Sequence, residues 1–491
     1  MYNPILCTDS YKLCHHLMYP KNTEYVYSYF ESRKGAKFDL TPFFGLHYLL
    51  KQFRKIDNYD IEHVRVMAAV HFGQATAKTL ELYRGGLSYN FDKYYKDIGQ
   101  RELFNIEGWK YVMKLGYLPI RIKAVPEGTL VPTNNVMMTV ENTDPKAWWI
   151  TNYFESFLTH VWYPSTVCAL SRSVKVMLKE FGDKTGSNDM LDFKLQDFGY
   201  RGVSSDESAD LGGAAHLVNF KGTDTFPAID FIRRYYSNGS AFDAAAYEGI
   251  GYSVPATEHS ICTALGEDGE PEIVGELLTD YPTGILSVVA DSYDINRFVE
   301  EYVGKKFKER ILARDGIFVV RPDSVTPELD TPEKEMVWIL DSLWSSFGGR
   351  VNEKGYKVIN DKIRVLWGDG IDIVGIRKIL EAITQAGFSI DCIACFGMGG
   401  GLLQKVNRDT QRFAFKSSAQ CRDGVWHDVY KRPRDVSKES KRGRLKLIND
   451  TGTLITVPET DPRPDVMETV YEDGKILVKP TFSEIRERAA L

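Results

Sequence analysis

The sequence predicts an α/β protein, namely an irregular TIM-like α/β barrel with a discontinuous mixed α/β domain built from both chain ends. Two features of the 491 residues indicate this fold. In the middle of the chain, short apolar runs recur roughly 30 to 45 residues apart, the size of a βαβ unit, and helical patterns separate them. About seven such units form a closed or nearly closed barrel of parallel strands. A doubly wound open sheet is the alternative architecture.

The predicted barrel strands share one feature, a polar residue or a glycine at the carboxyl end. They span residues 193–198, 215–221, 252–255, 285–290, 317–320, 363–367 and 393–396. A single Asp after a strand is usually the N-cap of the next helix. Because the carboxyl ends of barrel strands meet at one face, seven such ends together predict a shared site at that face.

The two ends of the chain have a different pattern. Alternating runs predict strands at 25–30, 120–125, 136–140 and 453–457, and amphipathic runs predict helices at 46–54 and 61–72. We therefore expect a mixed α/β domain from residues 1–165 plus 417–491. The barrel, residues 166–416, is inserted between its two parts.

Composition excludes several classes of protein. The net charge is −6 and hydrophobic residues make up 43%, which is typical of a globular protein with no general affinity for nucleic acid. No apolar run approaches the roughly 20 residues that span a bilayer, and the N-terminus lacks a signal peptide. We expect a cytoplasmic protein that binds neither membrane nor nucleic acid.

The cysteines do not suggest a disulfide framework. There are seven of them, an odd number scattered through a long chain. Cys392 and Cys395 have the spacing of a redox pair, but they lie in an apolar run, where buried strand cysteines are the favoured interpretation. His15 and His16 lack a second cluster with ligand spacing, so they do not predict a metal site.

A glycine-rich turn follows the last predicted strand. Four of residues 396–401 (FGMGGG) are glycine, and basic residues follow at Lys405, Arg408, Arg412 and Lys416. Bare backbone N–H groups between a strand and a helix bind phosphate, so a phosphorylated small molecule is the expected ligand. Tight packing of helix on strand remains the alternative reason for the glycines.

Longer motifs are more specific than this turn. They occupy residues 8–12 (TDSYK), 197–205 (DFGYRGVSS), 219–225 (NFKGTDT), 251–260 (GYSVPATEHS), 291–295 (DSYDI), 321–324 (RPDS), 368–370 (GDG) and 396–409. In these residues the chain resembles the nicotinamide phosphoribosyltransferase family, a group of type II phosphoribosyltransferases. The resemblance implies transfer of the phosphoribosyl group of phosphoribosyl pyrophosphate to nicotinamide, giving nicotinamide mononucleotide and pyrophosphate in NAD biosynthesis. It also implies a homodimer with active sites at the interface.

The resemblance assigns the catalytic and diphosphate-binding residues. Arg201, His259 and Arg321 are expected to contact the diphosphate, which the planar Arg fork suits. His259, Asp291 and Asp323 are the expected catalytic group, with Asp291 orienting the imidazole. ATP is expected as a coupled activator that phosphorylates His259, and Mg²⁺ as a cofactor held through the pyrophosphate, with no direct protein ligand. A structural salt bridge is the alternative role for Arg201.

The same resemblance assigns the nicotinamide and ribonucleotide site. Its expected residues are Tyr11, Phe198, Asp224, Ser253, Arg321, Asp323, Gly368, Asp369, Gly399, Gly400, Arg408 and Lys416. Phe198 and Tyr11 of the other subunit stack on the two faces of the pyridine ring. Asp224 accepts a hydrogen bond from the amide N–H₂, which favours nicotinamide over nicotinate. Asp323 and Asp369 suit the ribose hydroxyls.

Some positions depart from the family pattern or stay open. Met398 stands where a small polar residue is more familiar, and residues 237–250 form a longer connection than expected. Lys431, Arg442 and Arg444 either reach the phosphates or are solvated surface charges. The competing functions are a nicotinate phosphoribosyltransferase, a catalytically inactive binding or signalling protein on the same scaffold, and an unrelated phosphate-binding barrel enzyme.

Overall fold

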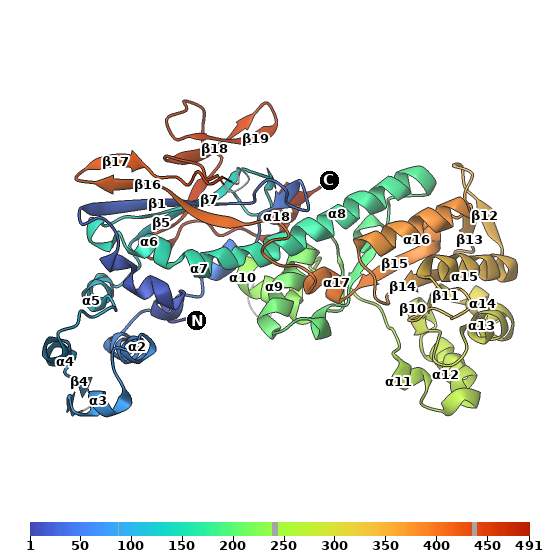
Figure 1. Ribbon diagram of the computed structural model, residues 1–491. Helices are drawn as coiled ribbons and strands as arrows, with labels where there is room; N and C mark the ends of the chain where they lie inside the picture. The colour runs from blue at the N-terminus through green and yellow to red at the C-terminus, as the bar shows by residue number, and fades with distance from the viewer. Residues whose placement is uncertain (87, 238–243, 435–438) are drawn as a thin grey trace. The chain divides into compact units, whose positions relative to one another are not determined.

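A computed structural model describes residues 1–86, 88–237, 244–434 and 439–491. Residues 238–243 of the predicted connection at 237–250 therefore lie outside the described residues. The chain divides into two compact units (Figure 1). The terminal unit comprises Met1–Thr166 and Arg408–Arg488, and the barrel unit comprises Val167–Asn407 with Ala489–Leu491.

The terminal unit is built on a seven-stranded antiparallel sheet with the order β17-β16-β1-β7-β5-β20-β21. These strands are β1 (Thr23–Glu31), β5 (Ile120–Ala124), β7 (Val136–Asn142), β16 (Ala414–Arg422), β17 (Val425–Asp428), β20 (Glu468–Glu472) and β21 (Lys475–Ile476). Three two-stranded pairs accompany it: β2 (Leu40–Pro42) with β6 (Leu130–Pro132), β3 (Arg84–Gly85) with β4 (Ser88–Tyr89), and β18 (Leu445–Asp450) with β19 (Thr453–Pro458). The strands predicted at both chain ends are confirmed. The two ends of the chain share the seven-stranded sheet because β1 pairs with β16, whereas the predicted strand at 453–457 is β19 of a separate pair.

The helices of the terminal unit are mostly short. They are η1 (Pro4–Leu6), η2 (Ser10–Leu17), α1 (Leu46–Leu50), α2 (Asn58–His71), α3 (Ala77–Glu81), α4 (Phe91–Ile98), α5 (Ile106–Leu115), η3 (Pro145–Ala147), α6 (Ile150–Tyr153), α7 (Glu155–Leu158), η4 (Thr159–Val161) and α18 (Phe482–Ala489). The helix predicted at 46–54 ends early, at Leu50, whereas α2 matches the prediction and begins with a capping box at Asp57.

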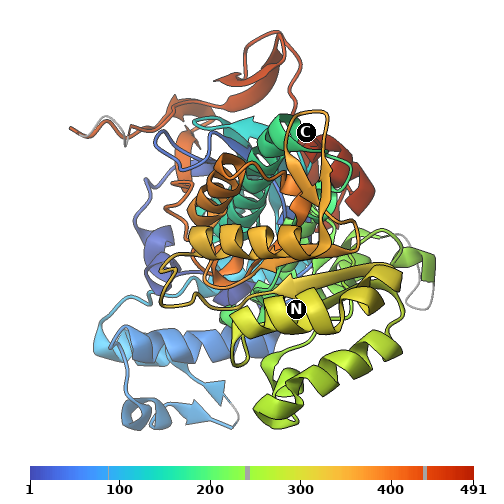
Figure 2. The same ribbon diagram turned by 90° about the vertical axis from the view of Figure 1, so that its right-hand side faces the viewer.

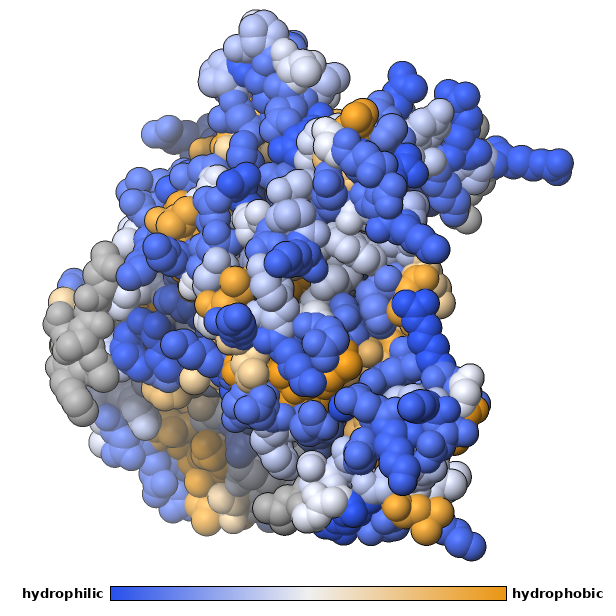
Figure 3. Space-filling view, turned by 90° about the vertical axis from the view of Figure 1, so that its left-hand side faces the viewer, coloured by the Kyte–Doolittle hydropathy of each residue, from blue (hydrophilic) through white to orange (hydrophobic). Residues whose placement is uncertain are grey.

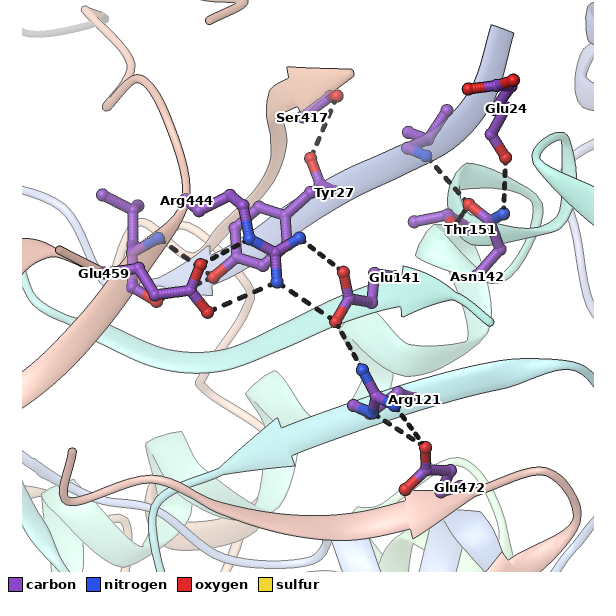
Figure 4. Close-up of polar contacts among 12 residues, drawn as sticks. Glu24, Tyr27, Arg121, Glu141, Asn142, Thr151, Ser417, Arg444, Glu459 and Glu472 are labelled. Carbon is purple, nitrogen blue, oxygen red and sulfur yellow. Dashed lines mark hydrogen bonds and ion pairs between the residues drawn. The ribbon is translucent and has the colours of Figure 1, made fainter. Parts of the chain in front are cut away.

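A charged network crosses the sheet of the terminal unit (Figure 4). The Arg444 guanidinium donates from Nη1 to Glu141 at 2.6 Å and from Nε to Glu459 at 2.5 Å. It also lies 4.8 Å from the centre of the Tyr27 ring and 4.6 Å from that of Trp426. Glu141 in turn accepts from Arg121, which also bonds Glu472. Arg444 is therefore a structural residue within its own unit.

Replacing Arg444 with Lys is expected to destabilise the protein by about 2 kcal/mol, because an ammonium cannot bond two carboxylates in a plane or stack between two rings. The melting temperature measures this effect. Arg432→Lys, at a side chain that is 73% exposed, is the matched control and should melt like the wild type. Equal melting temperatures for the two variants would contradict the structural role.

The barrel unit contains six parallel strands in the order β10-β11-β14-β15-β8-β9. They are β8 (Leu195–Asp197), β9 (Gly222–Thr223), β10 (Thr283–Val289), β11 (Asp315–Arg321), β14 (Ile363–Trp367) and β15 (Ile393–Met398), and a separate hairpin pairs β12 (Gly349–Val351) with β13 (Lys357–Ile359). An extended segment completes the ring, because Tyr252 bridges Gly222 of β9 and Ala256 bridges Ser287 of β10. The neighbours around the ring follow chain order, which confirms the irregular barrel and excludes a doubly wound sheet.

Helices surround the strands of this unit. They are α8 (Trp162–Thr185), η5 (Leu191–Phe193), η6 (Tyr200–Gly202), α9 (Asp206–Leu217), α10 (Pro227–Tyr236), η7 (Ala244–Ala246), α11 (His259–Cys262), α12 (Gly266–Asp280), α13 (Ile295–Arg297), the π-helix η8 (Phe298–Lys306), α14 (Lys308–Ala313), α15 (Pro332–Phe347), α16 (Ile373–Gln385), η9 (Ile390–Cys392) and α17 (Gly400–Leu403). Helices α15 and α16 pack against each other, and Figure 2 shows them in gold and orange. Side chains that face these helices, such as Leu286, Val288, Phe318 and Val320, are fully buried or nearly so.

Two of the seven predicted strands are wrong. Residues 215–217 end helix α9, and the strand beyond them is only β9. The apolar run there is helical because Ser205 caps the helix and Gly213 lets it approach Ala228, where a Cβ at 213 would lie 2.7 Å from that of Ala228. Residues 252–255 contain one isolated bridge, at Tyr252, and no strand, since Pro255 has no N–H to donate.

The surface and the helices agree with the composition. Figure 3 shows one face on which hydrophilic residues predominate and apolar residues form small separate groups. None of the helices in the described ranges combines the length and the apolar character needed to cross a bilayer. All seven cysteines are free. Of the two predicted strand cysteines, Cys395 lies in β15, whereas Cys392 ends η9, where burial raises its pKa to about 11.

Candidate active site

The barrel encloses a cavity of about 590 Å³. Successive side chains of a strand point to opposite faces, so every second residue points into the ring, as Ile317, Val319 and Arg321 of β11 do. Four of the predicted site residues line this cavity together: Phe198, Asp224, Ser253 and Arg321. Its size and mostly apolar lining with a few polar groups are typical of a small-molecule site.

Phe198 lies directly after β8, and its ring packs on glycines. A Cβ at Gly397 would lie 2.0 Å from the ring, and one at Gly368 would lie 3.1 Å from it. Any larger residue at 397 would displace the ring from the cavity wall. Gly368 therefore lies against the Phe198 ring, and its predicted role in the ribonucleotide site stays a prediction.

The backbone of the glycine turn lies next to this ring. A Cβ at Gly399 would lie 3.2 Å from the Phe198 carbonyl oxygen, whereas one at Gly400 would meet nothing within 4 Å. Gly400 begins α17 and leaves its backbone open to a ligand. Met398 is fully buried in β15 and pairs with Asp197, so its side chain does not face this opening.

A buried carboxyl holds the turn that carries Phe198. Asp197 is fully buried, and its Oδ1 accepts a hydrogen bond of 2.7 Å from the Gly199 N–H. Burial raises the pKa of Asp197 to about 6, with the negative charge of Asp224 contributing in the same direction. The pattern of β8 places Asp197 away from the cavity and Gln196 toward it.

Asp224 is held by two neighbours inside the cavity. Gln196 Nε2 donates to Asp224 Oδ1 at 3.0 Å, and the Ser253 hydroxyl donates to the same oxygen. Gln196 was not among the predicted site residues. The signal that identifies it is the alternation along β8, which puts it on the same face as the cavity.

His259 is the first residue of α11, and its ring lies between two of the predicted carboxylates. Its Nε2 lies 3.1 Å from Asp291 Oδ1, and its Nδ1 lies 4.0 Å from Asp323 Oδ2. The Ser324 hydroxyl donates to the other oxygen of Asp291, whose side chain is only 6% exposed. Asp291 thus contacts both the His259 ring and the Ser324 hydroxyl, and its role in orienting the imidazole stays a prediction.

Asp369 lies close to the same group. Burial raises the pKa of its carboxyl, and the charges of Asp323 and Asp291 raise it further. Three carboxylates this close favour a ligand that brings hydroxyl groups or positive charge. Across the described ranges, no three histidine, cysteine, aspartate or glutamate side chains are arranged to hold a metal ion directly.

The two predicted arginines of the barrel unit differ in their surroundings. Arg321 is half-buried at the end of β11, and its Nη2 donates to the Thr257 carbonyl at 2.6 Å. Arg201 is exposed in η6, beside the glycine turn, since a Cβ at Gly202 would lie 3.5 Å from Gly400. Neither forms an ion pair with any residue that the structure describes, so the salt-bridge alternative for Arg201 has no partner there.

The remaining predicted residues belong to the terminal unit. Tyr11 lies in η2 with 56% of its surface exposed, and Arg408 is exposed beside Asp409. Lys416 lies in β16, so the strand begins before the predicted domain boundary at 416. Burial lowers the pKa of Lys416, and the charges of Arg33, Arg408 and Lys431 lower it further. These four cations form a basic cluster, and Arg33 in it was not predicted.

Glu270 of α12 lies close enough to Asp291, the carboxylate that contacts His259, to interact with its charge. It is fully buried, and neither carboxyl oxygen has a hydrogen-bond partner among the described residues. Burial raises its pKa from 4.5 to about 7; Arg297 opposes this shift, whereas Glu267, Asp291 and Asp294 add to it. The folded state therefore binds this proton more tightly than the unfolded state, and stability is lost as the pH rises from 4.5 to 7.

Glu270→Gln is expected to remove the loss of stability that the wild type shows as the pH rises. At pH 8 the variant should melt about 2 to 4 °C above the wild type, and at pH 5 the two proteins should have the same melting temperature. Glu276→Gln, at an exposed position of the same helix, is the control and should show no such pH dependence. A Glu270→Gln variant that melts below the wild type at pH 8 would contradict the neutral state of this carboxyl.

Comparisons with known proteins agree with this geometry. The nicotinate phosphoribosyltransferase family matches residues 193–475, and the N-terminal domain of nicotinamide phosphoribosyltransferase matches residues 3–85. A nicotinamide phosphoribosyltransferase of Xanthomonas campestris pv. campestris is 43% identical over 99% of this chain and 98% of its own. One of Acinetobacter baylyi is 32% identical over 99% and 97%.

Solved structures share the fold. A nicotinate-nucleotide pyrophosphorylase from Pyrococcus furiosus covers 100% of this chain and 96% of its own with a TM-score of 0.58 at 15% identity. Human nicotinic acid phosphoribosyltransferase covers 98% and 92% with a TM-score of 0.51, also at 15% identity. With sequence relatives matching from end to end, the chain belongs to the nicotinate phosphoribosyltransferase family, within its nicotinamide phosphoribosyltransferase group.

Proposed function

We propose that this protein transfers the phosphoribosyl group of phosphoribosyl pyrophosphate to nicotinamide, giving nicotinamide mononucleotide and pyrophosphate for NAD biosynthesis. The observation that carries the proposal is that Asp224 and Arg321 line the same cavity. A carboxylate there suits the amide of the base, and a guanidinium suits the diphosphate. The relatives that match almost the whole chain are named for this reaction.

The base enters the cavity beside Phe198. Its pyridine ring stacks on the Phe198 ring, and its amide N–H₂ donates to Asp224. Nicotinate would instead bring a second negative charge next to Asp224, which costs several kcal/mol once the base has displaced water from between them. Tyr11 from a second subunit covers the other face of the ring, so the working form is a homodimer.

The reaction breaks the bond from the anomeric carbon to pyrophosphate and forms a bond from that carbon to the pyridine nitrogen. Catalysis rests on positioning and on stabilising the charge that the leaving group gathers. Arg321 and Arg201 bind the diphosphate, and Asp323 and Asp369 accept hydrogen bonds from the ribose hydroxyls. The backbone at Gly368, Gly399 and Gly400 approaches the sugar phosphate, and Arg408 and Lys416 supply positive charge there. Mg²⁺ bound to the pyrophosphate would neutralise part of its charge.

His259 couples the reaction to ATP in this proposal. Its ring takes the terminal phosphoryl group of ATP on Nδ1, since Asp291 holds Nε2, and ADP leaves. Hydrolysis of the phosphohistidine later returns the free ring and phosphate. A cytoplasmic location belongs to the same proposal.

The decisive assay measures nicotinamide mononucleotide formed from nicotinamide, phosphoribosyl pyrophosphate and Mg²⁺, with and without ATP. ATP should lower the nicotinamide KM of the wild type and leave that of His259→Ala unchanged. His63→Ala, at an exposed histidine of α2, is the control and should respond to ATP like the wild type. Product from nicotinate alone, or no product from either base, would refute the proposal. An ATP response in His259→Ala would refute only the phosphohistidine step.

A further inference from the structure

The carboxylate of Asp224 is bonded asymmetrically. Both neighbours, Gln196 Nε2 at 3.0 Å and the Ser253 hydroxyl, donate to Oδ1. None of the described side chains donates to Oδ2. A carboxylate held in this way presents one satisfied oxygen to the protein and one open oxygen to a ligand.

Gln196 is held in place from its other side as well. It pairs in register with Gly222 of β9, and a Cβ at 222 would lie 2.2 Å from its Oε1. Only a glycine leaves room there for the amide oxygen, so the side chain fits closely between Gly222 and Asp224. This contact is independent of the hydrogen bond to Asp224. The bond itself sets which end of the amide faces the carboxylate, since Nε2 is its only donor.

The chemistry of an amide suits this position. A neutral donor orients the Asp224 carboxylate and leaves its negative charge in place. A cationic donor would neutralise that charge, so the carboxylate of nicotinate would no longer be repelled. An apolar side chain would leave Oδ1 with one donor fewer and the carboxylate free to rotate. Orientation and charge of Asp224 both depend on the residue at 196.

We propose that Gln196 is a specificity-determining residue, which holds Asp224 Oδ1 so that Oδ2 meets the amide N–H₂ of the base and selects nicotinamide over nicotinate. The inference rests on the proposed function, since it names a further determinant of that same site. Gln196 acts through Asp224 and is thus a positioning residue. Its loss should weaken nicotinamide binding and leave the use of phosphoribosyl pyrophosphate unchanged.

The test compares kcat/KM for nicotinamide with kcat/KM for nicotinate. Gln196→Met keeps the length of the side chain and removes the donor, so the ratio should fall about tenfold, through the nicotinamide KM. The KM for phosphoribosyl pyrophosphate should not change. Gln100→Met, the same substitution at an exposed position, is the control and should keep the wild-type ratio.

The Gln196→Glu variant adds a pH signature that a purely structural role would not produce. A protonated Glu at 196 can donate to Asp224, and an ionised one repels it. The ratio of this variant should therefore approach the wild-type ratio at low pH and fall as the pH rises, while the wild-type ratio changes less.

A third variant covers the case in which Gln196→Met fails to fold. Gly222→Ala pushes on the amide oxygen and leaves the donor in place, and it should lower the ratio in the same direction. Ratios within twofold of the wild type for every folded variant would overturn the inference. A wild type that makes no nicotinamide mononucleotide would instead overturn the proposed function, so the two failures are distinguishable.

Discussion

Asp224→Asn should lower kcat/KM for nicotinamide by about 100-fold to 1,000-fold. The substitution keeps the shape of the side chain and removes its charge, and an Asn amide can turn its own N–H₂ toward the base. Two N–H₂ groups then face each other, and neither finds an acceptor. Once the base has displaced water from this part of the cavity, each unsatisfied donor costs about 1 to 3 kcal/mol.

The same variant should use nicotinate better than the wild type does. The carboxylate of nicotinate can accept from the Asn N–H₂, and it no longer meets the Asp224 charge. Measuring both bases with each variant separates this change in specificity from a general loss of activity. Asp280→Asn, at an exposed position of α12, is the control. If Asp224→Asn lost activity toward both bases in equal proportion, Asp224 would not be the residue that recognises the amide group of nicotinamide.

Much of the barrel could be predicted from the sequence, because its strands are short, apolar and separated by long helices. β10, β11, β14 and β15 lie where the runs at 285–290, 317–320, 363–367 and 393–396 predict them. The run at 215–221 misled the prediction because a buried helix end and a buried strand are equally apolar. Periodicity alone does not distinguish them over six or seven residues.

The site was predictable where a residue lies at a strand end, and not where it depends on register between strands. Arg321 ends β11 and Asp224 directly follows β9, and the motifs around them are long. The alternation along β8 puts Gln196 on the cavity face, but its contact with Gly222 depends on β8 pairing with β9, and no local pattern contains that pairing. Glu270 becomes notable only through its burial behind Asp291. Arg33 joins Lys416 only through β1 pairing with β16.

Arg321→Met should lower kcat/KM for phosphoribosyl pyrophosphate by about 1,000-fold. The Nη2 of Arg321 donates a hydrogen bond of 2.6 Å to the Thr257 carbonyl, while its Nε is buried and has no hydrogen-bond partner among the described residues. A half-buried cation held in this way, without an ion pair in the described structure, is arranged for an anion that arrives with the substrate. Arg321→Lys should recover only part of the activity, since one ammonium cannot bond a diphosphate in a planar pair.

Stability distinguishes this role from a structural one. An unpaired charge in the cavity wall costs free energy in the absence of substrate, so Arg321→Met should melt at or above the wild-type temperature while losing activity. Arg377→Met, an exposed arginine of α16 that pairs with Glu180 at 3.4 Å, is the control and should keep its activity. Pyrophosphate should raise the melting temperature of the wild type and not that of Arg321→Met. If Arg321→Met instead lost several degrees of stability along with its activity, the guanidinium would be holding the barrel together through Thr257, and the diphosphate would need another partner.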